Sequence, residues 1–298
     1  MPPAEHFAAP PYWEWWILGY FVFGGISGGS YAIATLIRIV GAPADQRLWR
    51  LAYIVSFIAL LPCPVFLILD LGQPLRFLNM LVDASDGGLS FKYWSPMSLG
   101  AWALLVYGIF SFVSFLGALA EGGTRALSPF AGFVHGALGM AWGVIGTGFG
   151  FFIAGYTGVL LAVSNQPVWS DAGWVLGGLF LASALTGAAA LLLALAHWRR
   201  VDAAEGAMRL MAADRNFAIL EAVLVVLFLA SVAIAGTIGK VLGIWILLWV
   251  VVLLGLLAPF AVSRMDGAAR RWSPVAAPVL SLLGLLALRA VIIFGPQS

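Results

Sequence analysis

The segment from Gly173 to Ala196 reads GWVLGGLFLASALTGAAALLLALA and contains no ionisable side chain. A helix rises about 1.5 Å per residue, so this segment is long enough to cross a hydrocarbon core of about 30 Å. Similar runs recur along all 298 residues, of which 62% are hydrophobic and 9% are charged. Soluble domains carry about 25% charged residues on average. The composition therefore excludes a soluble fold and predicts an all-α integral membrane protein.

Together with this segment, the other apolar runs predict eight transmembrane helices. They form one polytopic membrane domain that covers residues 1–298. The expected spans are 15–37, 48–69, 97–118, 130–163, 173–196, 217–238, 242–262 and 274–294. The fourth run would reach about 50 Å as a straight helix, so we expect it to tilt, kink or project beyond the membrane. Its glycines, including Gly148, Gly150 and Gly155, favour a kink.

Glycines at four-residue spacing lie in the first expected helix, where Gly24 pairs with Gly28 and Gly25 with Gly29. Small residues at this spacing let two helix backbones approach closely. We interpret these glycines as packing positions and not as ligand contacts.

Basic residues alternate between the two sides of the expected helices. One side holds Arg38, Arg47, Arg50, Arg125, Arg199, Arg200, Arg209, Arg215, Arg264, Arg270 and Arg271. The other side holds Arg76, Lys92 and Lys240. Cytoplasmic loops retain Lys and Arg, whereas short translocated loops lack them. We therefore expect both termini to lie outside, on the periplasmic side.

Metal ligands are scarce in this sequence. Cys63 is the single cysteine, so the chain can build neither a disulfide framework nor an iron–sulfur site. Haem b usually needs paired histidines on facing helices. Of the three histidines, His6 lies in the N-terminal tail, and His135 and His197 are expected at one membrane face. We expect no haem and no metal in this chain, which assigns any redox metal to another subunit.

Three ionisable residues are expected in the outer part of the membrane. Glu14 and Asp70 lie near the outer ends of the first two helices, and Arg289 lies at a similar depth in the eighth. An ionisable side chain inside an apolar run costs about 3 kcal/mol on insertion, so it usually faces a partner, a cavity or a proton path. A carboxylate and Arg289 can form an ion pair at this depth. Such a pair would either pin the eighth helix or have a functional role.

Glu221 and His135 are the corresponding candidates in the inner half. Glu221 is expected one turn into the sixth helix, and His135 in the first turns of the fourth. One interpretation makes them the cytoplasmic entrance of a water-filled proton path. The other is a buried polar pair with a structural role.

Four stretches, taken together, resemble one known family. They are Trp13-Glu14-Trp15-Trp16 leading into FGGISGGS (23–30), DLGQPLRF (70–77), SPMSLG (95–100), and GYTGVLL (155–161) followed by NQPVW (165–169). In order and spacing they resemble the NrfD/PsrC family, the membrane subunits of polysulfide-reductase-like complexes. The resemblance covers most of the chain and also implies eight helices in a prokaryotic plasma (inner) membrane.

The resemblance implies a haem-free quinone site that uses menaquinone or ubiquinone. Electrons would be exchanged with a four-cluster, ferredoxin-like iron–sulfur subunit, which serves a molybdopterin or cytochrome catalytic subunit. Tyr156 matches the quinone-contacting tyrosine of the family, and Tyr20, Trp169 and Asn165 are further candidates. Tyr20 and Ile17 stand where related proteins can present a histidine and an asparagine. The alternative for the aromatic residues is the aromatic belt of any membrane interface.

The loop after the second helix carries Asp70 and Arg76 on the side where the iron–sulfur subunit should dock. Gly72 and Pro74 between them indicate a turn, so these charges either contact the partner or cap the turn. We expect a quinone-reactive subunit that contacts membrane lipid, binds no nucleic acid and is inactive alone. The alternatives are a transporter or channel, and a structural anchor without quinone chemistry.

Overall fold

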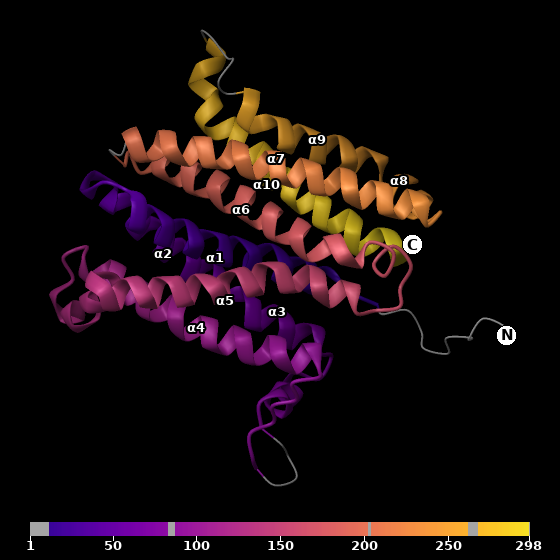
Figure 1. Ribbon diagram of the computed structural model, residues 1–298, viewed down its shortest axis with the longest axis horizontal. Helices are drawn as coiled ribbons and strands as arrows, with labels where there is room; N and C mark the ends of the chain where they lie inside the picture. The colour runs from indigo at the N-terminus through magenta and orange to yellow at the C-terminus, as the bar shows by residue number, and fades with distance from the viewer. Residues whose placement is uncertain (1–11, 83–86, 202–203, 262–267, 298) are drawn as a thin grey trace.

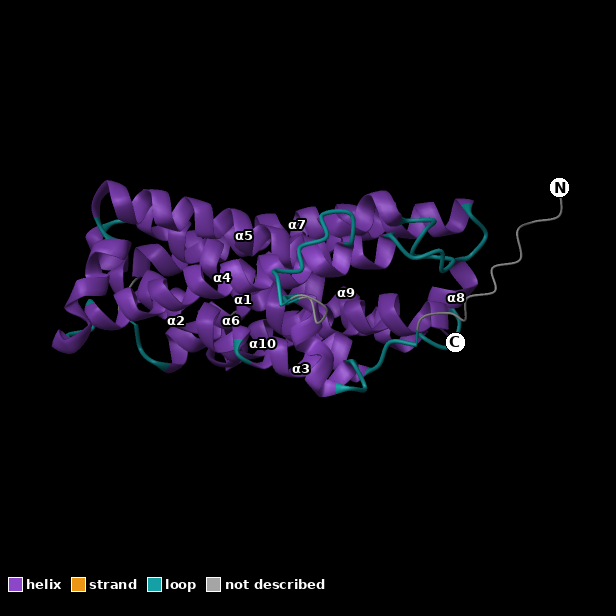
Figure 2. Cartoon of the chain, turned by 90° about the horizontal axis from the view of Figure 1, so that it is seen from below, coloured by secondary structure: helices purple, strands orange, loops and turns teal. Residues whose placement is uncertain are grey.

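The computed structural model describes residues 12–82, 87–201, 204–261 and 268–297. Long helices run side by side along one axis, joined by short loops, and the described chain holds no strand (Figures 1 and 2). The α-helices are α1 (Trp15–Val40), α2 (Gln46–Leu60), α3 (Pro62–Asp70), α4 (Pro96–Ala120), α5 (Gly136–Ala162), α6 (Gly173–Trp198), α7 (Ala204–Ile234), α8 (Ile238–Leu242), α9 (Ile246–Ala261) and α10 (Ala268–Phe294). The 3-10 helices are η1 (Pro43–Asp45), η2 (Pro74–Met80), η3 (Arg125–Val134) and η5 (Gly295–Gln297).

The predicted fold class is confirmed. Within the described residues, 7 helical segments are long and apolar enough to cross a membrane, and α9 is a shorter apolar helix. The second of the 7 is a composite of η1, α2 and α3 that runs from Pro43 to Asp70. It is interrupted between Leu60 and Pro62, because a proline has no N–H to donate to the preceding turn.

The predicted start of the fourth helix at Phe130 is wrong. Residues Arg125–Val134 form η3, and α5 begins only at Gly136. His135 is extended, and Gly136 has a φ of 62°, a left-handed conformation that glycine adopts without strain. The chain therefore turns at this point, and the excess length of the apolar run is taken up by η3. From Gly136 on, α5 is an uninterrupted helix of 27 residues.

The helix predicted at 217–238 is longer at its N-terminal end than expected. It begins at Ala204 and ends at Ile234 as α7. The predicted span 242–262 corresponds to α9, which begins at Ile246, and Val262 lies outside the described residues. The extension of α7 places Asp214 and Glu221 on one continuous helix.

The first helix, α1, packs against two neighbours with two adjacent faces. A Cβ atom on Gly28 would overlap the carbonyl oxygen of Gly150 in α5. On the other face, a Cβ on Gly29 would lie 2.7 Å from the carbonyl oxygen of Ala184 in α6. The predicted role of these glycines in close helix packing is therefore confirmed.

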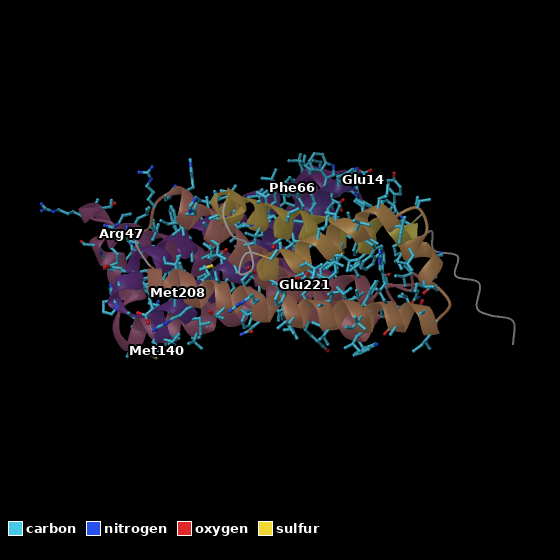
Figure 3. All side chains as sticks on the ribbon, turned by 90° about the horizontal axis from the view of Figure 1, so that it is seen from above. Glu14, Arg47, Phe66, Met140, Met208 and Glu221 are labelled. Atoms are coloured by element: carbon cyan, nitrogen blue, oxygen red, sulfur yellow. The ribbon has the colours of Figure 1, made fainter. Side chains whose placement is uncertain are left out.

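The bundle has two distinct ends. The terminal end holds both ends of the described chain, because the Trp13 backbone N–H donates to the Gln297 side chain at 2.7 Å. The arginine-rich end holds the close of α1, α4 and α6 and the start of α2, α5 and α7, with Arg47 among its residues (Figure 3). The position of both ends of the described chain on one side agrees with an even number of spans. That this side is periplasmic stays a prediction.

Candidate functional site

A groove with a volume of ≈ 420 Å³ lies over the part of α5 nearer the terminal end. The segment before α4, the first turn of α4, α5 and α6 form its walls. The lining residues are Tyr93, Trp94, Pro96, Leu99, Phe151, Phe152, Gly155, Tyr156, Val159, Gly177, Gly178 and Leu181. Aromatic rings and glycines dominate, so the surface is apolar, and the glycines leave space between α5 and α6. Phe151 and Val159 are exposed, which opens the groove towards lipid.

Tyr156 supplies one of the few polar groups of this lining, beside the Tyr93 hydroxyl and the Trp94 indole N–H. Its O–H donates to the carbonyl oxygen of Pro96 at 2.5 Å, and its ring stacks on Phe152 with centroids 5.3 Å apart. The ring also covers Gly100, where a Cβ atom would overlap the hydroxyl oxygen. Tyr156 is thus held between α5 and the N-terminus of α4, with 7% of its surface exposed.

Tyr20 lies behind Tyr156 and outside the lining of the groove. It is buried on α1, with 2% of its surface exposed, and its hydroxyl is close enough to Tyr156 and Cys63 for electrostatic interaction. The structure therefore brings together the two tyrosines that the sequence places at one depth. Ile17, one turn before Tyr20, is also buried and does not line the groove.

Trp169 and Asn165 lie in the connection between α5 and α6, away from the groove lining. The Trp169 indole N–H donates to the carbonyl oxygen of Ile292 at 2.6 Å, and its ring stacks on Trp13 at 5.1 Å. These contacts tie the connection to α10 and to the start of the chain. Asn165 is exposed.

The predicted pairing of Arg289 with Glu14 or Asp70 is wrong. The Arg289 guanidinium is fully buried and donates to the carbonyl oxygens of Phe21 in α1 and Phe180 in α6, the latter at 3.0 Å. It also lies 4.8 Å from the centre of the Phe180 ring. Glu14 is exposed before α1 and lies near Asp70 instead. Residues at the same depth in the membrane can lie on different faces of their helices. Arg289 points towards α1 and α6, so its depth alone does not bring it to Glu14 or Asp70.

The predicted pairing of His135 with Glu221 is also wrong. His135 lies at the arginine-rich end, half exposed, with Nε2 2.9 Å from a carboxylate oxygen of Glu121. Glu221 is buried near the middle of α7, well away from both Arg47 and Glu14 (Figure 3). It lies near Thr186 of α6, whose hydroxyl donates to the carbonyl oxygen of Ala182 at 3.1 Å, and close to the charge of Arg289. The sequence analysis did not identify Asp214, because the predicted helix began at 217. On the longer α7, the spacing of seven residues places Asp214 on the same helix face as Glu221.

The loop with Arg76 projects from the bundle between α3 and α4 (Figure 1). Arg76 is exposed in η2, and Asp70 is partly buried at the end of α3. Large apolar side chains in this loop are exposed as well: Leu75, Leu78, Leu89, Phe91, Tyr93 and Trp94. Several large exposed apolar side chains in one loop are typical of contact with a protein or with lipid.

Across the described part of the chain, no three His, Cys, Asp or Glu side chains come together as metal ligands. The family model described as "Polysulphide reductase, NrfD" matches residues 5–298. The chain belongs to the NrfD family. The resemblance drawn from the four sequence stretches is therefore confirmed, and this NrfD-family chain is a multi-pass membrane protein.

One curated relative of this NrfD chain is a selenate reductase subunit of Mesobacillus selenatarsenatis. It is 31% identical over 98 residues, which are 33% of this chain and 21% of the relative. The matched segment spans about a fifth of that relative's length.

Proposed function

We propose that this chain is the quinone- or quinol-binding membrane subunit of a respiratory reductase complex. It carries no haem and exchanges electrons with an iron–sulfur subunit. The observation that carries the proposal is the apolar groove beside Tyr156. Quinone sites need an apolar cleft for the ring and tail with few polar groups at the ring oxygens, and this groove supplies both.

The hydrogen bonding of Tyr156 favours the reduced ligand. A tyrosine hydroxyl has one donor and two acceptor lone pairs, and here the donor is used on the Pro96 carbonyl. The lone pairs can accept a hydrogen bond from the O–H of a quinol. To donate to a quinone carbonyl, Tyr156 would have to release Pro96. A bound quinone supplies two-electron, two-proton redox chemistry, whereas Tyr156 orients the head group and the aromatic walls exclude water.

Partner proteins are proposed from family membership and from the relative that belongs to a reductase. We expect a four-cluster, ferredoxin-like iron–sulfur subunit and a molybdopterin or cytochrome catalytic subunit. The loop with Asp70 and Arg76 is the candidate docking surface, because it combines exposed charge with exposed apolar side chains near the groove. Electrons would then pass between groove and partner over a short path on the terminal side.

A structural anchor without quinone chemistry is the competing function. Purification in lipid nanodiscs, followed by extraction and mass spectrometry of bound quinone, separates the two. The quinone proposal predicts about one menaquinone or ubiquinone per chain, and a saturable titration with a fluorescent quinol analogue. Preparations that are free of quinone and do not bind the analogue would support the structural anchor.

A further inference from the structure

Two buried carboxyl groups lie on one face of α7. Asp214 and Glu221 have 5% and 4% of their surface exposed and are seven residues apart, which is two helical turns or about 10.5 Å. Their charges are close enough to interact. One carboxylate oxygen of Asp214, Oδ1, has no hydrogen-bond partner in the described chain. Buried carboxyl groups are costly inside a membrane unless they serve a path or a partner.

A small cavity lies at the arginine-rich end, and its lining includes Ala213, the residue before Asp214. It has a volume of ≈ 70 Å³ and lies between the end of α1, Asp45 of η1 and the first half of α7, including Arg209, Ala213 and Phe217. Asp45 is buried, and its Oδ1 also has no partner among the described residues. Most of the lining is apolar, and Asp45 and Arg209 supply its polar side chains. The volume is large enough for water beside these two groups, because a single water needs roughly 15 Å³ and two to four polar partners. The cavity therefore gives solvent a place at Asp45 and Arg209, in a lining that includes the residue before Asp214 on α7.

The other carboxyl group, Glu221, faces a cation and a hydroxyl group. Thr186 of α6 and the charge of Arg289 of α10 lie next to it, and Asp214 is the carboxyl group within electrostatic reach on α7 itself. Arg289 gives its hydrogen bonds to the carbonyls of Phe21 and Phe180, and its Nε has no partner in the described residues. Glu221 is therefore near a positive charge that other groups hold in place.

Further hydroxyl groups continue beyond Glu221. Ser183, one turn from Thr186 on α6, and Ser30 on α1 are buried without a hydrogen-bond partner in the described chain. Gly25 leaves space for the guanidinium, because a Cβ there would lie 2.7 Å from Nη2 of Arg289. Polar groups without partners in a packed core are uncommon, and here they occur on α1, α6, α7 and α10.

We propose that Asp214 and Glu221 form a proton relay that leads from the cavity at the arginine-rich end into the interior of the bundle. Hydronium in the cavity gives its proton to the Asp214 carboxylate and becomes water. The Asp214 carboxylic acid then gives this proton, through water, to the Glu221 carboxylate, and the Asp214 carboxylate is restored. Glu221 returns the proton by the same route when the pH rises. Consumption of the proton by quinone reduction, which takes two electrons and two protons, rests on the proposed function.

The relay can be tested on the full chain in nanodiscs by infrared spectroscopy of protonated carboxyl groups. Acidification should produce a carboxylic C=O band that Glu221→Gln removes and Glu221→Asp retains at a shifted frequency. In Asp214→Asn the Glu221 band should persist, but its hydrogen–deuterium exchange should slow by about 100-fold, as expected for loss of a positioned proton carrier. Glu121→Gln is the control, since Glu121 follows α4, pairs with His135 at 2.9 Å and lies outside both α7 and the cavity lining. It should change neither band nor rate.

Two results would overturn the relay: no Glu221 band at any pH at which the chain is folded, or parental exchange in Asp214→Asn. Near-ultraviolet circular dichroism checks that each variant is folded, and the Asp214→Asn measurement decides the question even if Glu221→Gln does not fold. No quinone takes part, so a failed relay leaves the quinone proposal standing. Conversely, loss of quinol binding in a groove variant leaves the relay intact.

Discussion

Replacing Gly178 with leucine should block the groove without disturbing the bundle. Gly178 lines the groove on α6, and a Cβ atom there would meet only side-chain atoms of Leu224 at 3.8 Å, which is ordinary contact. Leucine is also a better helix former than glycine, by roughly 0.8 kcal/mol. The matched control is Gly148→Leu on α5, because Gly148 is exposed, lies outside the groove lining and has nothing within 4 Å of its Cβ position.

The size of the effect follows from the atoms that the leucine adds. If its four side-chain carbons displace contacts of a similar number of ligand atoms, at about 0.3 kcal/mol each, binding weakens by about 1.2 kcal/mol or about eightfold. If the leucine also overlaps the ligand sterically, at a cost of up to about 3 kcal/mol, binding weakens by up to about 150-fold. The assay is titration of the chain in nanodiscs with a fluorescent quinol analogue, together with quinol-linked turnover of the assembled complex. Parental affinity in Gly178→Leu would refute the assignment of the groove.

Three further changes test other parts of the account. Tyr156→Phe should weaken quinol binding by about 1 kcal/mol, or about fivefold, while the catalytic subunit keeps its activity with artificial dyes. If the variant binds quinol as tightly as the parent, Tyr156 serves only to pack α5 against α4. Trp169→Phe should lower the free energy of unfolding by about 1 kcal/mol, because the hydrogen bond to the Ile292 carbonyl is lost, and should leave quinol affinity unchanged. A large loss of quinol affinity would show that Trp169 belongs to the quinone-binding site. Gly28→Ala should reduce the yield of folded chain in detergent, because its Cβ would overlap the carbonyl oxygen of Gly150, whereas Gly148→Ala should not.

The long apolar helices and their close packing could be predicted from the sequence. Runs such as 173–196 leave no other structure for the backbone in a membrane, since every N–H and C=O must be bonded within the segment. The spacing of Gly25 and Gly29 likewise predicted a close neighbour, which the structure identifies as α6. The apolar runs and the glycine spacing are both local features of the sequence. In a membrane they are sufficient to predict helices and their close packing.

The ends of α7 and the partners of its carboxyl groups could not be predicted in the same way. The first turns of α7 contain Arg209, Asp214 and Arg215, which a hydropathy reading assigns to a loop, although they form helix beyond the apolar run. Glu221 was therefore placed too near the helix end. Arg289 bonds to backbone carbonyls of α1 and α6, and no residue type in the sequence marks such acceptors.

The groove was only partly predictable. Family resemblance pointed to Tyr156, which does line it, but also to Trp169 and Asn165, which do not. Gly177 and Gly178 were not considered, because a glycine on a lipid-facing helix surface gives no chemical signal. These glycines contribute the space between α5 and α6. That space can be recognised only once the two helices are placed side by side in the structure.

The central claim is that quinone binds in the groove beside Tyr156. Its most direct test is photolabelling of the chain in nanodiscs with a photoreactive quinone, followed by peptide mass spectrometry. We expect label on residues 93–99, 151–159 or 177–181, competed by unlabelled quinol and reduced in Gly178→Leu. Label confined to α7, α9 or α10, or label that excess quinol does not displace, would contradict the account.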